Sequence, residues 1–195
     1  ITGGNHTMRA KGAFSLLEQR SEVLRPVNFG DSVVGSGYGI YDAQGYRVLV
    51  ISALGIVGVE PRLDSPFGYI DKVLAKCEGR YDVAVLDIHA EATSEKLALA
   101  HWFDGRVRVM FGTHTHVQTA DLQILENGTG YITDLGMTGP RDSVLGVRKD
   151  IIINRLKSND MSKFELATGE CMLNGCIFEI DNTTGKTVAV ELINI

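Results

Sequence analysis

The chain has 195 residues, of which 44% are hydrophobic and 22% charged, the ordinary balance of a globular domain that can bury a core without disulfides. We therefore expect residues 1–195 to form a single domain. The net charge of −5 argues against a protein that wraps nucleic acid through a basic surface, although it leaves room for a nucleotide substrate held by a local metal.

Helical and strand patterns alternate through the first half of the chain. The helical segments space their apolar residues along one face, and the strand segments are compact apolar runs rich in Val and Ile. Ser65 can cap a helix whose first turn holds Pro66. In chain order we expect a helix at 10–20, a strand at 46–53, a helix at 65–78, a strand at 81–87, a helix at 93–103 and a strand at 107–111.

The C-terminal third has a different pattern. Residues 122–133 predict a hairpin around an Asn127-Gly128 turn, and residues 171–194 predict a second hairpin with its turn at 182–185. Alternating strands and helices indicate an α/β core, so the predicted architecture is a mixed sheet flanked by helices with an antiparallel C-terminal part.

Four of the five histidines follow or end predicted strands or lie in glycine-containing loops. Ligand and catalytic groups gather at the carboxyl ends of strands in open α/β sheets, so these four are candidate site residues. They are His6, His89, His114 and His116. The fifth, His101, lies inside a predicted helix beside Trp102, where a surface or packing role is expected.

The segment Gly112-Thr113-His114-Thr115-His116 is the sharpest local feature. On an extended segment, two imidazoles at i and i+2 point to the same side and can reach one metal or two adjacent metals. Two histidines on a polar loop are the alternative, because a lone H-x-H is a weak signal.

The other candidate positions are ambiguous when taken singly. Asn5 offers a neutral carbonyl oxygen, a hard metal ligand, and His6 can act as a general acid, but Gly3-Gly4-Asn5 also suits a simple turn. Asp87 and Glu91, on either side of His89, are either metal ligands or caps of the following helix. Asp121 and Asp134 fit equally well as partners of the histidines or as turn residues.

In order, the motifs are G-N-H, a lone strand-end His, and G-x-H-x-H. This series resembles the calcineurin-like metallophosphoesterases, and more closely their YmdB-like branch. The segments that carry the resemblance are 4–7 (GNHT), 24–28 (LRPVN), 89–96 (HAEATSEK), 112–121 (GTHTHVQTAD) and 131–140 (YITDLGMTGP).

The resemblance implies a calcineurin-like sandwich of mixed sheets flanked by helices and a phosphodiesterase with two divalent metal ions. Mn²⁺ and Fe²⁺ are expected first, with Zn²⁺ or Mg²⁺ as alternatives. Asn5, His89 and His114 would bind one metal and His116 the other, while His6 would protonate the leaving oxygen and need a carboxylate partner. The implied substrate is a small phosphodiester, with 2′,3′-cyclic nucleotides expected first.

The family's early G-D-I and E-N segments do not precede Asn5. The resemblance therefore implies that the first strands and about half of the metal ligands are missing here, so that this chain alone would be inactive.

Two rival hypotheses remain. Amidohydrolases also use H-x-H, but on the first strand of a barrel of about 250 residues. A non-catalytic metal-binding or regulatory domain could use the same fold.

The chain shows neither a membrane-span pattern nor a signal peptide, and its three cysteines are widely spaced. We therefore expect free thiols, a cytoplasmic location and no membrane partner, and we leave a homo-oligomer open.

Overall fold

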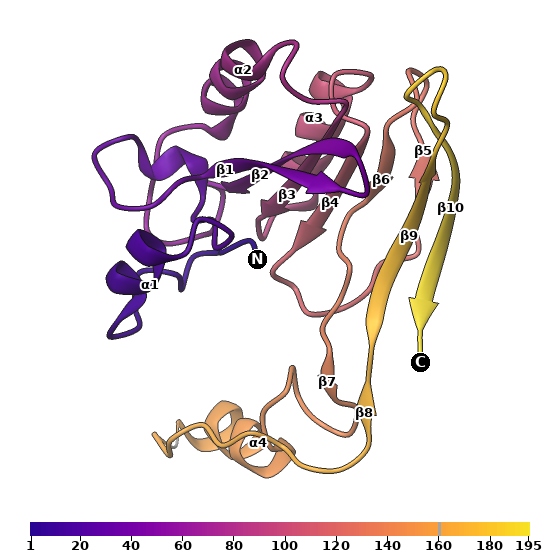
Figure 1. Cartoon of the computed structure of the whole chain (residues 1–195). Helices are drawn as coiled ribbons and strands as arrows, with labels where there is room; N and C mark the ends of the chain where they lie inside the picture. Colours follow the sequence, from indigo (N-terminus) through magenta and orange to yellow (C-terminus); the bar gives the residue numbers. More distant parts are fainter. Residues whose placement is uncertain (160) are drawn as a thin grey trace.

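The computed structural model describes residues 1–159 and 161–195. A six-stranded sheet forms the body of the molecule, in the order β1-β2-β3-β4-β6-β5 (Figure 1). Its strands are β1 (Tyr38–Ala43), β2 (Tyr46–Leu54), β3 (Val83–His89), β4 (Val109–Thr113), β5 (Gln123–Ile124) and β6 (Gly130–Ile132).

The centre of this sheet is parallel and its edges are antiparallel. Strands β2, β3, β4 and β6 run parallel, while β1 and β5 each pair antiparallel with a neighbour. In the pairing of β3 with β4, His89 lies opposite Thr113, so both strands end at the same edge. The mixed α/β sheet is confirmed, and because it is open it is not the closed barrel of the amidohydrolase alternative.

The three predicted helices are confirmed as α1 (Ala13–Gln19), α2 (Pro66–Cys77) and α3 (Thr93–Phe103). Ser65 precedes α2, but its side chain makes no capping hydrogen bond, so the expected cap is wrong while Pro66 does open the helix. Four described elements were not predicted: η1 (Val27–Phe29), β1, β7 (Gly139–Pro140) and α4 (Lys149–Ser158).

The C-terminal hairpin is formed by β9 (Asn174–Ile180) and β10 (Thr187–Asn194). It runs along the side of the main sheet, while β7 (Gly139–Pro140), β8 (Cys171–Met172) and α4 extend away from the body (Figure 1). The second predicted hairpin is therefore confirmed from Asn174 onward, but Cys171 and Met172 pair with β7 instead.

One face of the sheet carries the helices. Alternate residues of the central strands, such as Leu49, Leu86 and Ile88, pack with α2 and α3 into the hydrophobic core. The intervening residues point to the opposite face, and on β3 these are Val83, Val85, Asp87 and His89. His89 is thus carried to the carboxyl edge of the sheet on the face without helices.

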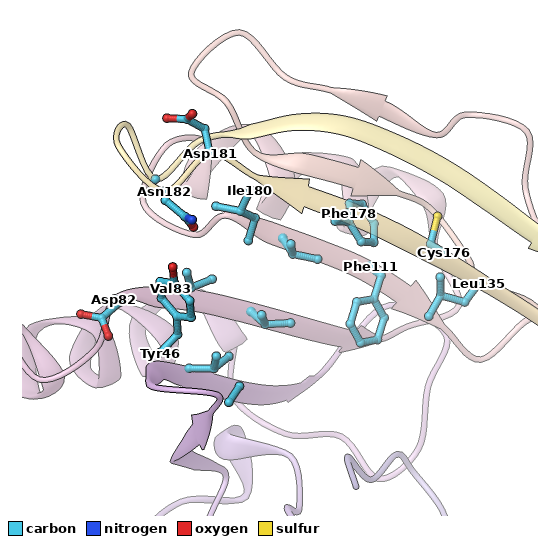
Figure 2. Close-up of a pocket in the computed structure, with 15 residues that line it drawn as sticks. Tyr46, Asp82, Val83, Phe111, Leu135, Cys176, Phe178, Ile180, Asp181 and Asn182 are labelled. Carbon is cyan, nitrogen blue, oxygen red and sulfur yellow. The ribbon is translucent and has the colours of Figure 1, made fainter.

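Between that opposite face and the C-terminal hairpin lies a cavity of about 500 Å³ (Figure 2). Its lining is mainly apolar and includes Val85 and Phe111 of the sheet and Phe178 of β9. The predicted site residues do not line this cavity, so it is distinct from the site that they would form. They are Asn5, His6, His89, His114 and His116. No helix in the described part of the chain combines the length and apolar character that a bilayer span requires.

Candidate functional site

The N-terminal segment is held against the carboxyl edge of the sheet. Thr2 forms a bridge with Leu24, and the backbone nitrogen of Leu24 donates to the carbonyl of Ile1 at 2.8 Å. The hydroxyl of Ser52 on β2 donates to the carbonyl of Gly3 at 3.2 Å. These contacts carry Asn5 over the ends of β3 and β4, where two of the candidate histidines lie.

Three predicted metal ligands come together at this edge. Oδ1 of Asn5 lies 3.2 Å from Nε2 of His89, and the same nitrogen lies 3.1 Å from Nδ1 of His114. The two imidazole rings meet edge to face, with centroids 4.9 Å apart. Separations of about 3 Å are those of neighbouring ligands around a cation with bonds of about 2.1 Å.

The far nitrogen of His89 determines which nitrogen faces the site. Thr113 donates its hydroxyl hydrogen to Oδ1 of Asp87 at 3.0 Å, so the Thr113 oxygen can only accept from Nδ1 of His89, which lies 3.0 Å away. The proton of a neutral His89 therefore sits on Nδ1. Its Nε2 is left as a lone pair facing Asn5 and His114.

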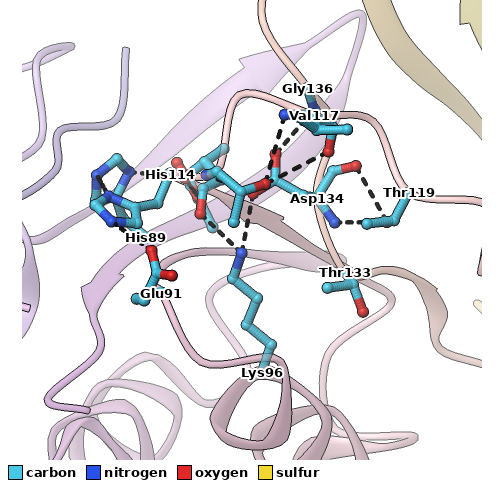
Figure 3. A network of polar contacts seen from close by, with 12 residues as sticks. His89, Glu91, Lys96, His114, Val117, Thr119, Thr133, Asp134 and Gly136 are labelled. Carbon is cyan, nitrogen blue, oxygen red and sulfur yellow. Dashed lines mark hydrogen bonds and ion pairs between the residues drawn. The ribbon is translucent and has the colours of Figure 1, made fainter. Parts of the chain in front are cut away.

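Glu91 plays the same part for His114. Its Oε2 lies 3.1 Å from Nε2 of His114 (Figure 3). Because a carboxylate only accepts, Nε2 of His114 carries a hydrogen, and in the neutral imidazole Nδ1 then presents a lone pair to His89. Glu91 is thus neither a helix cap nor a member of the converging set; it orients the ring of His114, one of the predicted ligands.

Burial keeps the site acceptor-rich. Desolvation lowers the pKa of His89 to about 4, with His114 and Lys96 adding to the effect. Desolvation also raises the pKa of Asp87 to about 6, so near pH 7 this carboxylate is still mainly ionised and accepts from Thr113. His89 is therefore neutral near pH 7, which is the state in which an imidazole binds a metal.

His116 does not join the other three. Its Nδ1 lies 3.3 Å from the carbonyl oxygen of Leu145, on the loop before α4. The expectation that His114 and His116 lie on an extended segment is wrong, because β4 ends at Thr113 and both histidines have positive φ angles, 108° and 66°.

His6 lies beside Asn5 with a different neighbour from the one expected. Nη1 of Arg9 lies 3.2 Å from its Nε2, in place of the expected carboxylate partner. Because a guanidinium only donates, Nε2 of His6 accepts this hydrogen bond. Partial burial and the Arg9 charge lower the pKa of His6.

Gly4 is required by the close approach of Asn5. A Cβ at this position would lie 2.6 Å from both Cδ2 and Nε2 of His89. The Gly4-Asn5 pair therefore serves to bring an amide oxygen next to an imidazole, a function that a simple turn does not need.

The donor set fits a divalent cation of borderline character. Within the described residues, no group of three or more His, Cys, Asp or Glu side chains is placed to hold a metal, because the third donor at this edge is the amide of Asn5. Two imidazole nitrogens and an amide oxygen suit Mn²⁺, Fe²⁺ or Zn²⁺.

Lys96 is a residue of this region that was not predicted from the sequence. It is fully buried and paired with Asp134 at 3.0 Å (Figure 3). Lysine in an amphipathic helix ordinarily marks the solvent face, so no pattern around Lys96 indicates this role. Asp121, by contrast, accepts from the backbone nitrogen of Thr133 and acts within the loop. His101 is exposed, as expected.

The chain matches one protein family and a named bacterial relative over nearly its whole length. The family model described as "YmdB-like protein" matches residues 1–193. The chain is 44% identical over 195 residues to the Bacillus subtilis protein named 2′,3′-cyclic-nucleotide 2′-phosphodiesterase, covering all of this chain and 74% of that protein.

Two solved structures share the fold over the whole chain. A hypothetical protein from Thermus thermophilus superposes with a TM-score of 0.91 at 34% identity, over 75% of that chain. A structure described as a novel phosphatase from Mycoplasma pneumoniae gives a TM-score of 0.90 at 35% identity, over 71% of that chain.

Proposed function

This chain belongs to the YmdB-like protein family, and on that premise we propose that it hydrolyses phosphodiester bonds with a dinuclear metal centre, taking 2′,3′-cyclic nucleotides as substrates. It is a hydrolase of the phosphoesterase class. One observation carries the proposal: three acceptor atoms, from Asn5, His89 and His114, converge at the carboxyl edge of the sheet.

These acceptors need a positive charge between them. The partners of His89 and His114 on the far side of each ring place both hydrogens away from the site. Two lone pairs 3.1 Å apart repel one another unless a cation or proton lies between them. Asn5, His89 and His114 would hold one metal, and His116, turned away toward Leu145, would hold the other.

When bound, the two cations would supply Lewis acidity to the phosphoryl group and to the attacking water. The protein's own contribution is orientation and proton transfer. Water forms the new bond to phosphorus and releases a proton to solvent, while the bond from phosphorus to one ribose oxygen breaks. Protonated His6 supplies the proton that this oxygen needs and takes up another from solvent afterwards.

Arg9 has a defined part in this scheme. It donates to Nε2 of His6, and a guanidinium also binds phosphate oxygens well. A bound phosphodiester would therefore draw Arg9 toward itself, and Nε2 of His6 could then take up the proton that it passes to the leaving oxygen.

The test measures metal content together with hydrolysis of bis-p-nitrophenyl phosphate and 2′,3′-cyclic AMP in the presence of Mn²⁺. This chain spans 74% of its Bacillus subtilis relative, so the assay uses both this chain and the product of the complete reading frame that contains it. Binding of about two metals with turnover by the complete product is the expected result. Metal binding without cleavage would favour the non-catalytic alternative, and failure to bind metal would overturn the proposal.

A further inference from the structure

The buried ion pair between Lys96 and Asp134 lies beside the turn from Thr113 to His116 (Figure 3). Nζ of Lys96 on α3 is 3.0 Å from Oδ2 of Asp134, and both side chains are 0% exposed. Removing two charges from water is costly, and a well-packed apolar pair of similar size often serves stability equally well. Stability alone therefore does not account for this pair.

Each member of the pair also binds backbone next to His114. Lys96 donates to the carbonyl of Thr113 at 2.9 Å, and Oδ2 of Asp134 accepts from the backbone nitrogen of Thr115 at 3.0 Å. The other carboxylate oxygen accepts from the nitrogen of Gly136 at 2.9 Å. The ion pair is thus hydrogen-bonded to the backbone on both sides of His114.

The backbone of His114 is strained. His114 has a φ of 108°, and His116 has a φ of 66°, in a region that side-chain-bearing residues rarely adopt. Such conformations persist only where surrounding contacts over-determine them, and they cluster at functional sites. Gly112 contributes as well, because a Cβ there would overlap the carbonyl of Thr133 and lie 2.8 Å from Cδ of Lys96.

We propose that Lys96 and Asp134 are positioning residues, which hold the turn from Thr113 to His116 in the conformation that presents His114 and His116 to the metals. The inference rests on the proposed function for its metals. It goes beyond that function in assigning a role to two residues that touch neither metal nor substrate.

The test compares three variants, Asp134→Asn, Lys96→Met and the double variant, by calorimetric titration with Mn²⁺ and by thermal unfolding. Each single variant should lower Mn²⁺ affinity about 10–100-fold, as loss of a group that orients a ligand does, and should also lower the melting temperature. The double variant, which leaves no buried charge unpaired, should regain much of the melting temperature but none of the affinity. Recovery of wild-type affinity in the double variant would overturn the proposal.

Asp104→Asn is the matched control. Asp104 also accepts from two backbone nitrogens, those of Asn127 and Thr129, but it lies beyond the end of α3, before β4 begins. This variant should lose stability while keeping Mn²⁺ affinity. An affinity loss equal to that of Asp134→Asn would show that any loss of stability weakens binding, against the proposal.

A measurement without metal separates this inference from the proposed function. Hydrogen exchange at the Thr115 amide of the metal-free chain should be slow in the wild type and at least about tenfold faster in Asp134→Asn, because the amide loses its charged acceptor. Unchanged exchange would refute the positioning role. If the wild type binds no Mn²⁺ but exchange at Thr115 is faster in Asp134→Asn, the proposed function fails. The conclusion that the ion pair holds the turn would still stand.

Discussion

Nε2 of His89 faces Nδ1 of His114 at 3.1 Å, and each ring gives its hydrogen to a partner on its far side, Thr113 and Glu91 respectively. The two facing atoms are therefore both acceptors. Such an arrangement would suit a bound cation.

Removing one of the facing nitrogens should weaken metal binding strongly. His89→Ala is expected to weaken Mn²⁺ binding by more than about 100-fold, since the loss of a ligand costs more than the loss of its orienting partner. Calorimetric titration measures this, and His101→Ala on the exposed side of α3 is the matched control. Equal affinity in the two variants would remove His89 from the ligand set.

Glu91 should matter through His114. In Glu91→Gln the acceptor remains in part but the charge is lost, so we expect an affinity loss of about tenfold. Nitrogen-15 NMR should also show the proton of His114 shared between Nδ1 and Nε2, whereas in the wild type it resides on Nε2. Glu78→Gln, at the exposed end of α2, should change neither quantity. A wild-type spectrum with the proton on Nδ1 would contradict this account of His114.

His6 should be needed for turnover and not for metal binding. His6→Ala is expected to lower kcat by about 10²–10⁴-fold, the range for loss of a general acid, with the metal content unchanged. The assay is hydrolysis of 2′,3′-cyclic AMP by the complete gene product. A variant that keeps wild-type kcat would assign the proton to another group.

Two glycines should respond in opposite ways to alanine. Gly4→Ala places a Cβ 2.6 Å from the His89 ring, so it should push Asn5 away and weaken Mn²⁺ binding. Gly68, inside α2, has open space where a Cβ would lie, and Gly68→Ala should stabilise the helix by about 1 kcal/mol. Titration and thermal unfolding of both variants test this; the idea fails if Gly4→Ala binds Mn²⁺ like the wild type.

The ion pair of Arg47 and Asp82 should give the stability a dependence on acid pH. Hydrogen bonding to Arg47 lowers the pKa of Asp82 from 3.8 to about 2. Because the folded-state pKa is the lower one, the pair stabilises the protein above pH 3.8, and its contribution is lost as the pH falls toward 2. Urea midpoints of the wild type and Asp82→Asn should therefore differ near pH 6 and converge in acid. A difference that stays constant with pH would contradict the assignment.

The sequence predicted the strands that carry the site but not the geometry of the turn between them. The Val-rich runs before His89 and before Gly112 identified β3 and β4, and the rule that strand ends share an edge brought His89 and His114 together. The left-handed backbone at His114 could not be read from residue type, since histidine rarely adopts it. The burial of Lys96 could not be predicted for a related reason. Helical periodicity assigns a lysine to the solvent face, and the tertiary contact with Asp134 explains why this one is buried.

Edge elements were also harder to predict than central ones. β1 lies at the edge of the sheet, and its residues, from Tyr38 to Ala43, include Gly39 and Asp42, which disfavour a strand. It forms because β2 offers a complete row of hydrogen-bonding partners along its length.

Asn5 and His89, which the site brings within 3.2 Å, lie 84 positions apart in the chain. A cation shared by them would act as a reversible cross-link between distant parts of the chain. Because these atoms meet only in the folded chain, the free energy of binding would add to the stability of the fold. Chelation would then loosen the N-terminal segment before the sheet, and protease cleavage within the first dozen or so residues would report the occupancy of the site.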